Sequence, residues 1–280
     1  MFNRSRTISL FSILTLFACG PTAQEPEEAI APAEAGAGDE IPSEPPPPPP
    51  PAYLRLVHAS PDPAASNLQL SSDGEPLISD LTLHTGSTYA ELAPGAHMLS
   101  ITPTGAEASA TLTFAESPEL TSGAHYTAIV HGLTSGAPPI GLAIAMERNQ
   151  PPAEGRANVR VFHAIAGVDA LDLCVAGASP RDPAIVLYPG VEYGAFGASE
   201  SGDYAELPAE GELALQLRTR HATPCRGRLL GVARTALSAG ENHMLVLLGR
   251  TTGRPRVERE LVICAEAQGG SCIAMPITSR

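Results

Sequence analysis

The stretch Tyr53–Asp62, YLRLVHASPD, decides the fold of this chain, because it returns in altered form as NVRVFHAIAG at Asn158–Gly167. In both places apolar residues occupy every second position of a short run that ends in a histidine. This period of two is typical of a β-strand. The Ser-Pro-Asp-Pro sequence that follows His58 favours a turn. The pair of stretches therefore predicts a duplicated unit that opens with a β-strand.

Three further segments return in the same order along the chain. Asn67–Leu70 corresponds to Asp172–Val175, Tyr89–Leu92 to Tyr204–Leu207, and Gly123–Val130 to Gly240–Leu247. The offset between partners grows from 105 to 117 residues, so loops are longer in the second copy, notably around Gly197–Gly202. We therefore predict two repeats, residues 52–151 and residues 152–280.

Each copy contains short alternating or apolar runs, separated by clusters of Gly, Pro, Asp and Ser. In the first copy these runs are LRLVH, NLQLS, HMLSIT, ATLTF, HYTAIV and IGLAIAM. Such a pattern is typical of an all-β sandwich or barrel. Only Gly227–Ser238, GRLLGVARTALS, is ambiguous between a short helix and a strand. The expected fold is two tandem antiparallel β-sandwich domains of immunoglobulin-like or transthyretin-like kind, each of about 100 residues.

The motifs of the first copy resemble the bacterial domain-of-unknown-function family 4397. The resemblance rests on HASPDP at His58–Pro63, LAPG at Leu92–Gly95 and GAHYTAIV at Gly123–Val130. The second copy keeps the arginine and histidine of the first motif but has Ile-Ala-Gly in place of Ser-Pro-Asp. Members of this family are common in exported and anchored proteins, often as tandem copies. The resemblance implies no known activity.

The first 19 residues have the features of a secretory signal. Arg4 and Arg6 precede an apolar run, Ile8–Ala18, that is too short to span a bilayer. The run ends in Leu-Phe-Ala-Cys, which resembles the lipobox of bacterial lipoproteins and implies lipidation of Cys19. An ordinary signal peptide with an incidental cysteine is the alternative. Gly20 follows where an aspartate would imply retention at the inner membrane, so the resemblance favours the outer membrane.

Residues 20–51 are expected to form a disordered tether. They hold 11 of the 28 prolines and seven acidic residues but no basic one. Such a segment cannot bury enough apolar area to offset the entropy of ordering its chain. The unbroken prolines of Pro45–Pro51 favour a stiff polyproline II spacer. A stalk that lifts the repeats from the membrane is the favoured interpretation, and an SH3-type ligand is the alternative.

The net charge of −13 is unevenly distributed, and the chain contains no lysine. Residues 52–151 carry nine acidic residues against two arginines, whereas residues 152–280 carry fourteen against thirteen. An acidic surface repels nucleic acids and anionic lipids, so neither is an expected partner.

His58, Ser60 and Asp62 invite comparison with a hydrolase triad. Three residues so close together on one strand and turn rarely converge in space as a triad requires, and the second copy keeps only the histidine, His163. We therefore interpret His58 and His163 as structural histidines at strand ends, each ring nitrogen being paired within the fold. No catalytic residue is predicted.

Metal and cofactor motifs are equally lacking. The sequence has no HExxH motif, no CxxC pair, no acidic calcium loop and no glycine-rich phosphate loop. A zinc site built from His97, His125 and His131 is the alternative to scattered strand-end histidines. We expect neither a metal nor a cofactor.

Besides Cys19 the chain has four cysteines, all in the second copy: Cys174, Cys225, Cys264 and Cys272. An even number in an exported chain predicts disulfides, and four cysteines allow three connectivities. We favour Cys174–Cys225 and Cys264–Cys272. The first pair would hold a long loop against the sandwich. The second would close the short segment AEAQGGS.

These features predict a non-enzymatic protein of the cell envelope, anchored through lipid on Cys19 to the outer membrane or cell surface. Its role would be structural or adhesin-like, with another envelope protein as its partner. A surface protein that binds carbohydrate or another small ligand is the alternative. That alternative requires exposed aromatic side chains, for which Tyr188, Tyr193, Phe196 and Tyr204 are the candidates. A hydrolase that uses His58 or His163 is the least favoured class.

Overall fold

The computed structural model describes residues 47–104, 111–114, 119–177, 179, 182–253, 256–266 and 272–279. The signal peptide, Cys19 and the tether as far as residue 46 lie outside these residues, as does the segment 267–271 between Cys264 and Cys272. Nearly all regular structure is β, in several sheets whose strands pair mostly antiparallel, which confirms the predicted β-sandwich class.

The N-terminal half, from β1 to β10, has two four-stranded sheets. One has the order β10-β9-β1-β4 and the other β3-β2-β6-β7, and a small β5-β8 pair lies beside them. A single turn of 3₁₀ helix, η1, follows the first strand. The elements are β1 (Ala52–His58), η1 (Pro63–Ala65), β2 (Asn67–Ser72), β3 (Glu75–Thr82), β4 (Ala90–Leu92), β5 (Gly95–Ala96), β6 (Leu99–Pro103), β7 (Leu112–Thr113), β8 (Glu119–Leu120), β9 (His125–His131) and β10 (Gly141–Met146).

The C-terminal half, from β11 to β19, repeats this arrangement. Its sheets have the orders β14-β11-β17-β18-β19 and β13-β12-β15-β16. The strands are β11 (Arg156–Ala166), β12 (Ala170–Val175), β13 (Ile185–Glu192), β14 (Ala205–Pro208), β15 (Leu213–Thr219), β16 (Leu229–Thr235), β17 (Asn242–Arg250), β18 (Val257–Ala265) and β19 (Cys272–Pro276). The ambiguous segment Gly227–Ser238 thus contains a strand, β16.

Strand pairing shows how closely the halves correspond. β1 pairs in parallel with β9 and antiparallel with β4, and β11 pairs in parallel with β17 and antiparallel with β14. In each half the first strand therefore lies inside its sheet, between a strand from the middle of the half and one from near its end. The C-terminal half adds β19 at the sheet edge.

Each half has its own core, which lies between its two sheets. In the N-terminal half Leu54 and Leu56 of β1 face Leu68 and Leu70 of β2. The equivalent residues of β11 and β12 fill the core of the C-terminal half. Burial of these alternate residues provides the main favourable term, at about 25 cal/mol per Å² of apolar surface.

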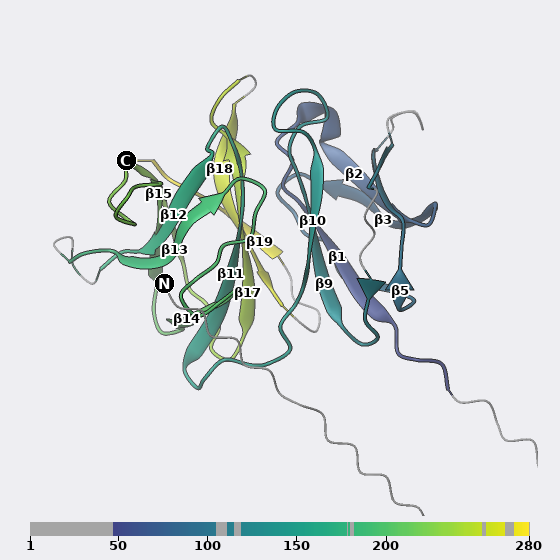
Figure 1. The fold of residues 1–280 in the computed structure, drawn as a ribbon, viewed down its shortest axis with the longest axis horizontal. Coiled ribbons are helices and arrows are strands. Elements are labelled where there is room, and N and C mark those ends of the chain that lie inside the picture. Colours follow the sequence, from purple (N-terminus) through teal and green to yellow (C-terminus); the bar gives the residue numbers. More distant parts are fainter. Residues whose placement is uncertain are drawn as a thin grey trace, which may run out of the picture. The chain divides into compact units, whose positions relative to one another are not determined.

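A third apolar cluster lies between the two halves, which belong to one compact unit, Pro47–Arg280. It joins Val57 and Ile129 of the N-terminal half to Phe162, Val246 and Val262 of the C-terminal half. Figure 1 shows the sheet of β1, β9 and β10 facing the sheet of β11, β17, β18 and β19. The first strand of each half is therefore buried on both faces. This arrangement places its polar side chains in an interface rather than in solvent.

Candidate functional site

The interface between the halves contains one arginine from the first strand of each. Arg55 lies between Leu54 and Leu56 on β1, and because side chains alternate along a strand it points away from the core. Arg160 has the equivalent place on β11. Arg55 is 0% exposed and Arg160 is 8% exposed, so both charges are held away from water. Such groups need partners within the protein.

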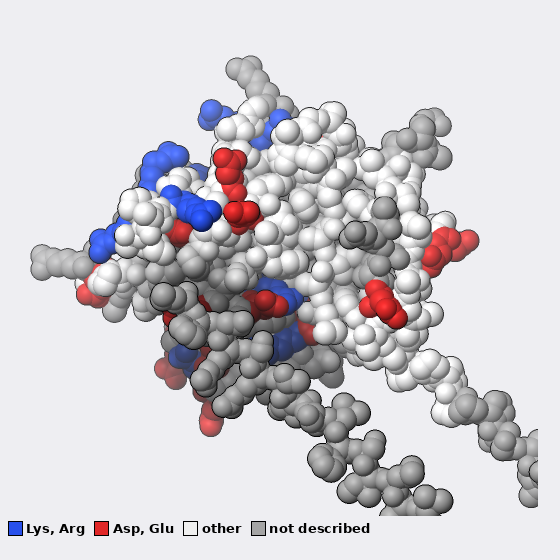
Figure 2. All heavy atoms as spheres, in the orientation of Figure 1, with Lys and Arg blue, Asp and Glu red and all other residues white. Residues whose placement is uncertain are grey.

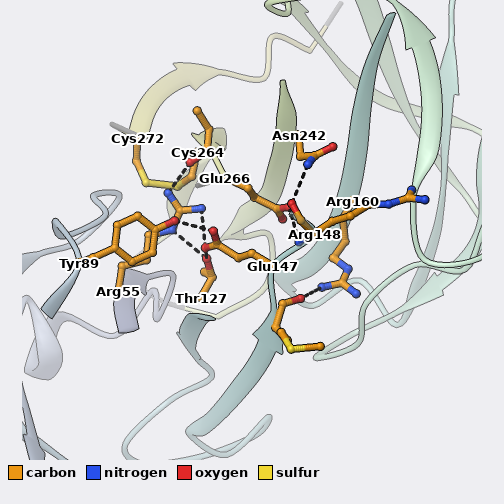
Figure 3. Close-up of polar contacts among 12 residues, drawn as sticks. Arg55, Tyr89, Thr127, Glu147, Arg148, Arg160, Asn242, Cys264, Glu266 and Cys272 are labelled. Carbon is orange, nitrogen blue, oxygen red and sulfur yellow. Dashed lines mark hydrogen bonds and ion pairs between the residues drawn. A yellow bond between two sulfur atoms is a disulfide. The ribbon is translucent and has the colours of Figure 1, made fainter. Parts of the chain in front are cut away.

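In the N-terminal half the partners of Arg55 are Tyr89 and Glu147. The guanidinium lies 5.0 Å from the centre of the Tyr89 ring, and Arg55 Nη2 lies 3.0 Å from Glu147 Oε1. The Tyr89 hydroxyl donates to Glu147 Oε2 at 2.5 Å, and Thr127 donates to Oε1 of the same carboxylate. Arg55 Nε in turn donates to Thr127 Oγ1 at 2.8 Å. Figure 3 shows these side chains converging.

The C-terminal half repeats the set with Arg160, Tyr204 and Glu266. Arg160 lies 4.6 Å from the centre of the Tyr204 ring, and the Tyr204 hydroxyl donates to Glu266 Oε2 at 2.6 Å. Glu147 and Glu266 also have equivalent backbone positions, since each directly follows a strand and donates its N–H to the first residue of the neighbouring strand. We call Arg55–Tyr89–Glu147 and Arg160–Tyr204–Glu266 the interface triads.

The two arginines cross the interface in a reciprocal manner. Arg55 Nη1 donates to the carbonyl of Ala265 at 2.7 Å, and Arg160 Nη1 donates to the carbonyl of Met146 at 3.0 Å. Ala265 and Met146 each directly precede the glutamate of their own triad. Each arginine thus donates to the residue of the opposite half that corresponds to the acceptor in its own half. Reciprocal contacts of this kind are typical of a two-fold interface. The contacts between the two halves therefore have the pattern found at the interface of a symmetric dimer.

The triads nevertheless differ in their charge pairing. Arg55 forms its ion pair with the buried Glu147, whereas Arg160 pairs with Asp203 at 2.9 Å, and the Asp203 side chain is 72% exposed. Within the described part of the chain, Oε1 of Glu266 has no hydrogen-bond donor. Burial raises the pKa of Glu266 to about 7, against the opposing effect of the Tyr204 hydrogen bond.

Other contacts extend the interface beyond the triads. The Cys264–Cys272 disulfide packs directly against Gly86, where a side chain would collide with the Cys272 sulfur. His84 Nδ1 of the N-terminal half lies 2.8 Å from Glu260 Oε2 on β18. Chain segments far apart in the sequence therefore also meet outside the triads.

His58 and His163 have equivalent surroundings. Both are 0% exposed. His58 Nε2 donates to the carbonyl of Ala65 at 2.6 Å, and its Nδ1 accepts from the N–H of Ser60 at 3.3 Å. His163 Nε2 donates to Val168 at 2.9 Å, and its Nδ1 accepts from Ile165 at 3.2 Å. Burial lowers the pKa of each histidine to about 4, so both are neutral at pH 7.

Ser60 and Asp62 hold the turn that follows β1. The Ser60 hydroxyl donates to the carbonyl of Gly132 at 2.7 Å, and Asp62 Oδ2 accepts from the N–H of Thr134 at 2.7 Å. These bonds attach the turn to the β9–β10 loop. A hydrolase would require an accessible His58 and a hydrogen bond between the Ser60 hydroxyl and the His58 ring. His58 is instead buried, and the Ser60 hydroxyl donates to Gly132.

The four aromatic candidates for a ligand platform do not lie on an open surface. Tyr188 is 0% exposed, and its hydroxyl donates to the carbonyl of Val159 at 2.5 Å. Tyr204 is buried in its triad. Tyr193 and Phe196 are half-buried. The exposed aromatic cluster that the alternative, ligand-binding interpretation requires is therefore not formed by these four side chains, which pack in the core and the interface.

Both predicted disulfides are confirmed. Cys174–Cys225 links β12 to the long loop before β16, with a sequence separation of 51 residues. Cys264–Cys272 links β18 to β19, with a separation of 8. The N–H of Cys225 also donates to the buried Asp172 at 2.9 Å, so a polar contact accompanies the first disulfide.

Among the residues that the structure describes, no helix has the length and apolar character needed to cross a membrane. Within the same ranges, no three His, Cys, Asp or Glu side chains gather as they would around a metal ion. His97, one candidate zinc ligand, instead pairs with Asp73 at 2.7 Å and with the carbonyl of Ala93.

Sequence reasoning missed the interface triads, although two signals for them were present. The arginine and the tyrosine both recur between the copies, in LRLVH and NVRVFH and in the two YAEL segments. The run Met244–Leu248 of β17 is also apolar on both faces, a pattern that indicates burial on both sides.

The family model "Domain of unknown function (DUF4397)" matches residues 52–174. The match supports this family for that segment. It spans the whole N-terminal half together with β11 and nearly all of β12. No curated protein matches the chain.

Two solved structures are similar to the chain at low identity. One is described as "Alpha-glucan binding by a streptococcal virulence factor", at 12% identity, covering 70% of this chain and 93% of that one, with a TM-score of 0.22. The other is CBMbc (family CBM26) from Eubacterium rectale Amy13K in complex with maltoheptaose, at 8% identity, covering 77% and 98%, also with a TM-score of 0.22. Such TM-scores carry no argument about fold or ligand.

Proposed function

We propose that this chain is an exported, lipid-anchored protein of the cell envelope, and that its two halves form one rigid, non-enzymatic interaction module. The observation that carries the proposal is the reciprocal pair of interface triads. Its arginine, tyrosine and glutamate side chains contact one another, and the arginines also donate to carbonyls of the opposite half. Arginine, tyrosine and glutamate side chains can take part in catalysis in enzymes, but in this protein they hold the two halves in a fixed arrangement.

Rigidity follows from how the interface is composed. Removing one partner of a buried ion pair leaves an uncompensated charge, which is strongly unfavourable. Separation of the halves would expose the Arg55 and Arg160 crossings to water together with the apolar cluster between them. A module of fixed shape suits a protein that presents a surface to another envelope protein or to a surface ligand.

The two disulfides support export, because such bonds form and persist in oxidising compartments. Attachment to the outer membrane or cell surface through Cys19 rests on the lipobox-like sequence alone. Several acyl chains would anchor the chain far more stably than one.

The anchor is tested by metabolic labelling with a palmitate analogue. Wild type is expected to incorporate the label and to fractionate with membranes, whereas Cys19→Ala incorporates none and is released. Equal labelling of both chains, or none in either, would reject the anchor.

Rigidity is tested by denaturant unfolding of the mature chain. Wild type is expected to unfold in one cooperative transition, and the double variant Arg55→Ala with Arg160→Ala in two, as each half unfolds separately. Two transitions in wild type would contradict a single rigid module. Arg234→Ala, an exposed arginine distant in sequence from both triads, is the matched control.

A further inference from the structure

A cleft of about 1650 Å³ opens at one end of the C-terminal half. Its walls come from the β11–β12 turn, the adjoining ends of β15 and β16, the region where β17 passes into β18, and the chain at and after the end of β19. Every residue that lines it belongs to this half. The cleft is larger than the clefts of about 300–1,000 Å³ that hold single small ligands.

Arginines dominate the charge of the cleft. It is lined by the five arginines Arg220, Arg228, Arg250, Arg256 and Arg259, against three carboxylates, Asp169, Glu192 and Glu258. This local excess of positive charge contrasts with the net charge of −13 on the chain. Figure 2 shows arginines gathered over the C-terminal half at the upper left, while much of the opposite side of the view is uncharged or acidic.

We propose that this cleft binds an anionic oligosaccharide whose sugars carry carboxylate or phosphate groups. The guanidinium group is planar and presents its donors in a fork that matches both anions. The volume of the cleft suits several sugars rather than one ion.

Two of the arginines are fixed and three are available to a ligand. Arg250 Nε donates to the carbonyl of Thr252 at 2.9 Å, and the Arg259 guanidinium donates to the carbonyl of Leu230. Arg228 and Arg256 are exposed, and their guanidinium groups make no hydrogen bond or ion pair with the described residues.

Arg220 is the third available arginine. Its side chain is 62% exposed, and its contact with Glu192 is long, at 3.6 Å, between two exposed groups. Pairs of this kind contribute little to stability, so a ligand can displace Glu192 at small cost.

The remaining lining distinguishes an anionic sugar from other ligands. No aromatic ring lines the described part of the cleft, so neutral sugars have no face on which to stack. Hydroxyl side chains are frequent instead and can pair with sugar hydroxyls: Thr219, Thr251, Thr252, Thr278 and Ser279. The acidic remainder of the chain repels long polyanions such as nucleic acids.

The proposal is tested by calorimetric titration of the mature chain with four probes at equal concentration. These are tri-galacturonate, a phosphorylated maltotriose, unmodified maltotriose and tri-glutamate. We expect an anionic sugar to bind, with affinity that falls as salt is added, and maltotriose to give no signal. The tighter of the two anionic sugars identifies the preferred anion.

Arg228→Ala with Arg256→Ala is expected to weaken that binding at least tenfold, because two charge-assisted contacts are lost. Arg234→Ala, which pairs with Glu212 outside the cleft, is the matched control and should bind as wild type does. The proposal is overturned if maltotriose or tri-glutamate binds as tightly as the anionic sugars, if no anionic sugar binds, or if the control loses as much affinity as the double variant.

This inference is independent of the proposed function, because the cleft lies wholly within the C-terminal half. Unfolding of wild type in two transitions would reject the rigid module while binding persists. If the variant with Arg228→Ala and Arg256→Ala loses binding but keeps the melting temperature of wild type, the binding site lies in the cleft, whether or not the two halves form one rigid module.

Discussion

The turn that follows the first strand forms hydrogen bonds through its own side chains in the N-terminal half and through its backbone carbonyl in the C-terminal half. Ser60 and Asp62 bond to the β9–β10 loop in the first case. In the second, the N–H of Thr251 donates to the carbonyl of Ala166 at 2.9 Å, and Gly167 takes a φ of +87° that side chains disfavour. In both halves Nδ1 of the histidine before the turn accepts from the N–H two residues on, whereas Nε2 donates to a carbonyl 7 residues on in the first half and 5 residues on in the second.

Features that occur in both halves are candidates for what the fold requires, and features that occur in one half are not. The buried histidine and the Arg–Tyr–Glu triad occur in both halves, whereas the Ser-Pro-Asp turn, the disulfides and the arginine-lined cleft occur in one. A turn can be stabilised either by side-chain hydrogen bonds or by backbone hydrogen bonds. A polar interface that two halves share reciprocally requires matching groups on both sides.

The triads should respond unequally to loss of their arginines. Arg55→Ala leaves Glu147 buried without its counterion, and we expect the free energy of unfolding to fall by about 3–5 kcal/mol. Arg160→Ala should lower it by about 1–2 kcal/mol, because Asp203 is left exposed to water. Denaturant unfolding measures both. An equal or larger effect of Arg160→Ala would remove the distinction between the triads.

The two disulfides should also differ in effect. In the chain-entropy model, replacing Cys174 and Cys225 by alanine lowers the free energy of unfolding by about 4 kcal/mol, because the closed loop is long. Replacing Cys264 and Cys272 should lower it by about 2–3 kcal/mol. Thermal unfolding of both variants, with wild type under reducing conditions as a control, checks the order. The reverse order would mean that the packing of Cys272 on Gly86 outweighs loop closure.

Glu266 should make the stability of the protein depend on pH. The folded-state pKa of Glu266 is raised to about 7, so its contribution to stability is fully present below pH 4.5 and is lost as pH rises through 7. Glu266→Gln removes this dependence. We expect the variant to gain up to about 3 kcal/mol relative to wild type between pH 4.5 and 8. Unfolding free energies measured across this range provide the test.

Glu147→Gln is the matched comparison for that prediction. It leaves Arg55 without its carboxylate, so the variant should be less stable than wild type at pH 8. If Glu266→Gln is as destabilising as Glu147→Gln when both are measured at pH 6, Glu266 is already ionised there and its pKa is not raised.

The smallest effect concerns the turns. Ser60→Ala removes a buried hydrogen bond to Gly132 and should lower the free energy of unfolding by about 1 kcal/mol. Thr251→Val, in the C-terminal half, removes only a longer side-chain bond of 3.2 Å, so a smaller change is expected. Urea unfolding distinguishes them. A loss of several kcal/mol in Ser60→Ala would indicate that this turn is as essential as the histidine before it.

Local patterns in the sequence were sufficient for much of the fold. Alternation in LRLVH and NVRVFH predicted strands β1 and β11, and the even number of cysteines in an exported chain predicted disulfides that the structure confirms. The strand β3 was not predicted. Its sequence, EPLISDLT, has mixed polarity and begins directly after an Asp-Gly turn, and long-range pairing with β2 stabilises it.

The sequence alone predicted the β class and two repeats, favoured the cysteine pairs that the structure contains, and indicated the side of each first strand on which its histidine lies. These depend on periods and spacings of a few residues, which the chain contains locally. The burial of the other face of those strands, which carries Arg55 and Arg160, could be seen only in the tertiary structure. The tertiary structure brought Arg55, Tyr89 and Glu147 into one site, and five arginines from the β15–β16 connection and the region where β17 passes into β18 into another. Alternation indicates which residues share a face, but which sheet or loop covers that face depends on contacts between residues far apart in the chain.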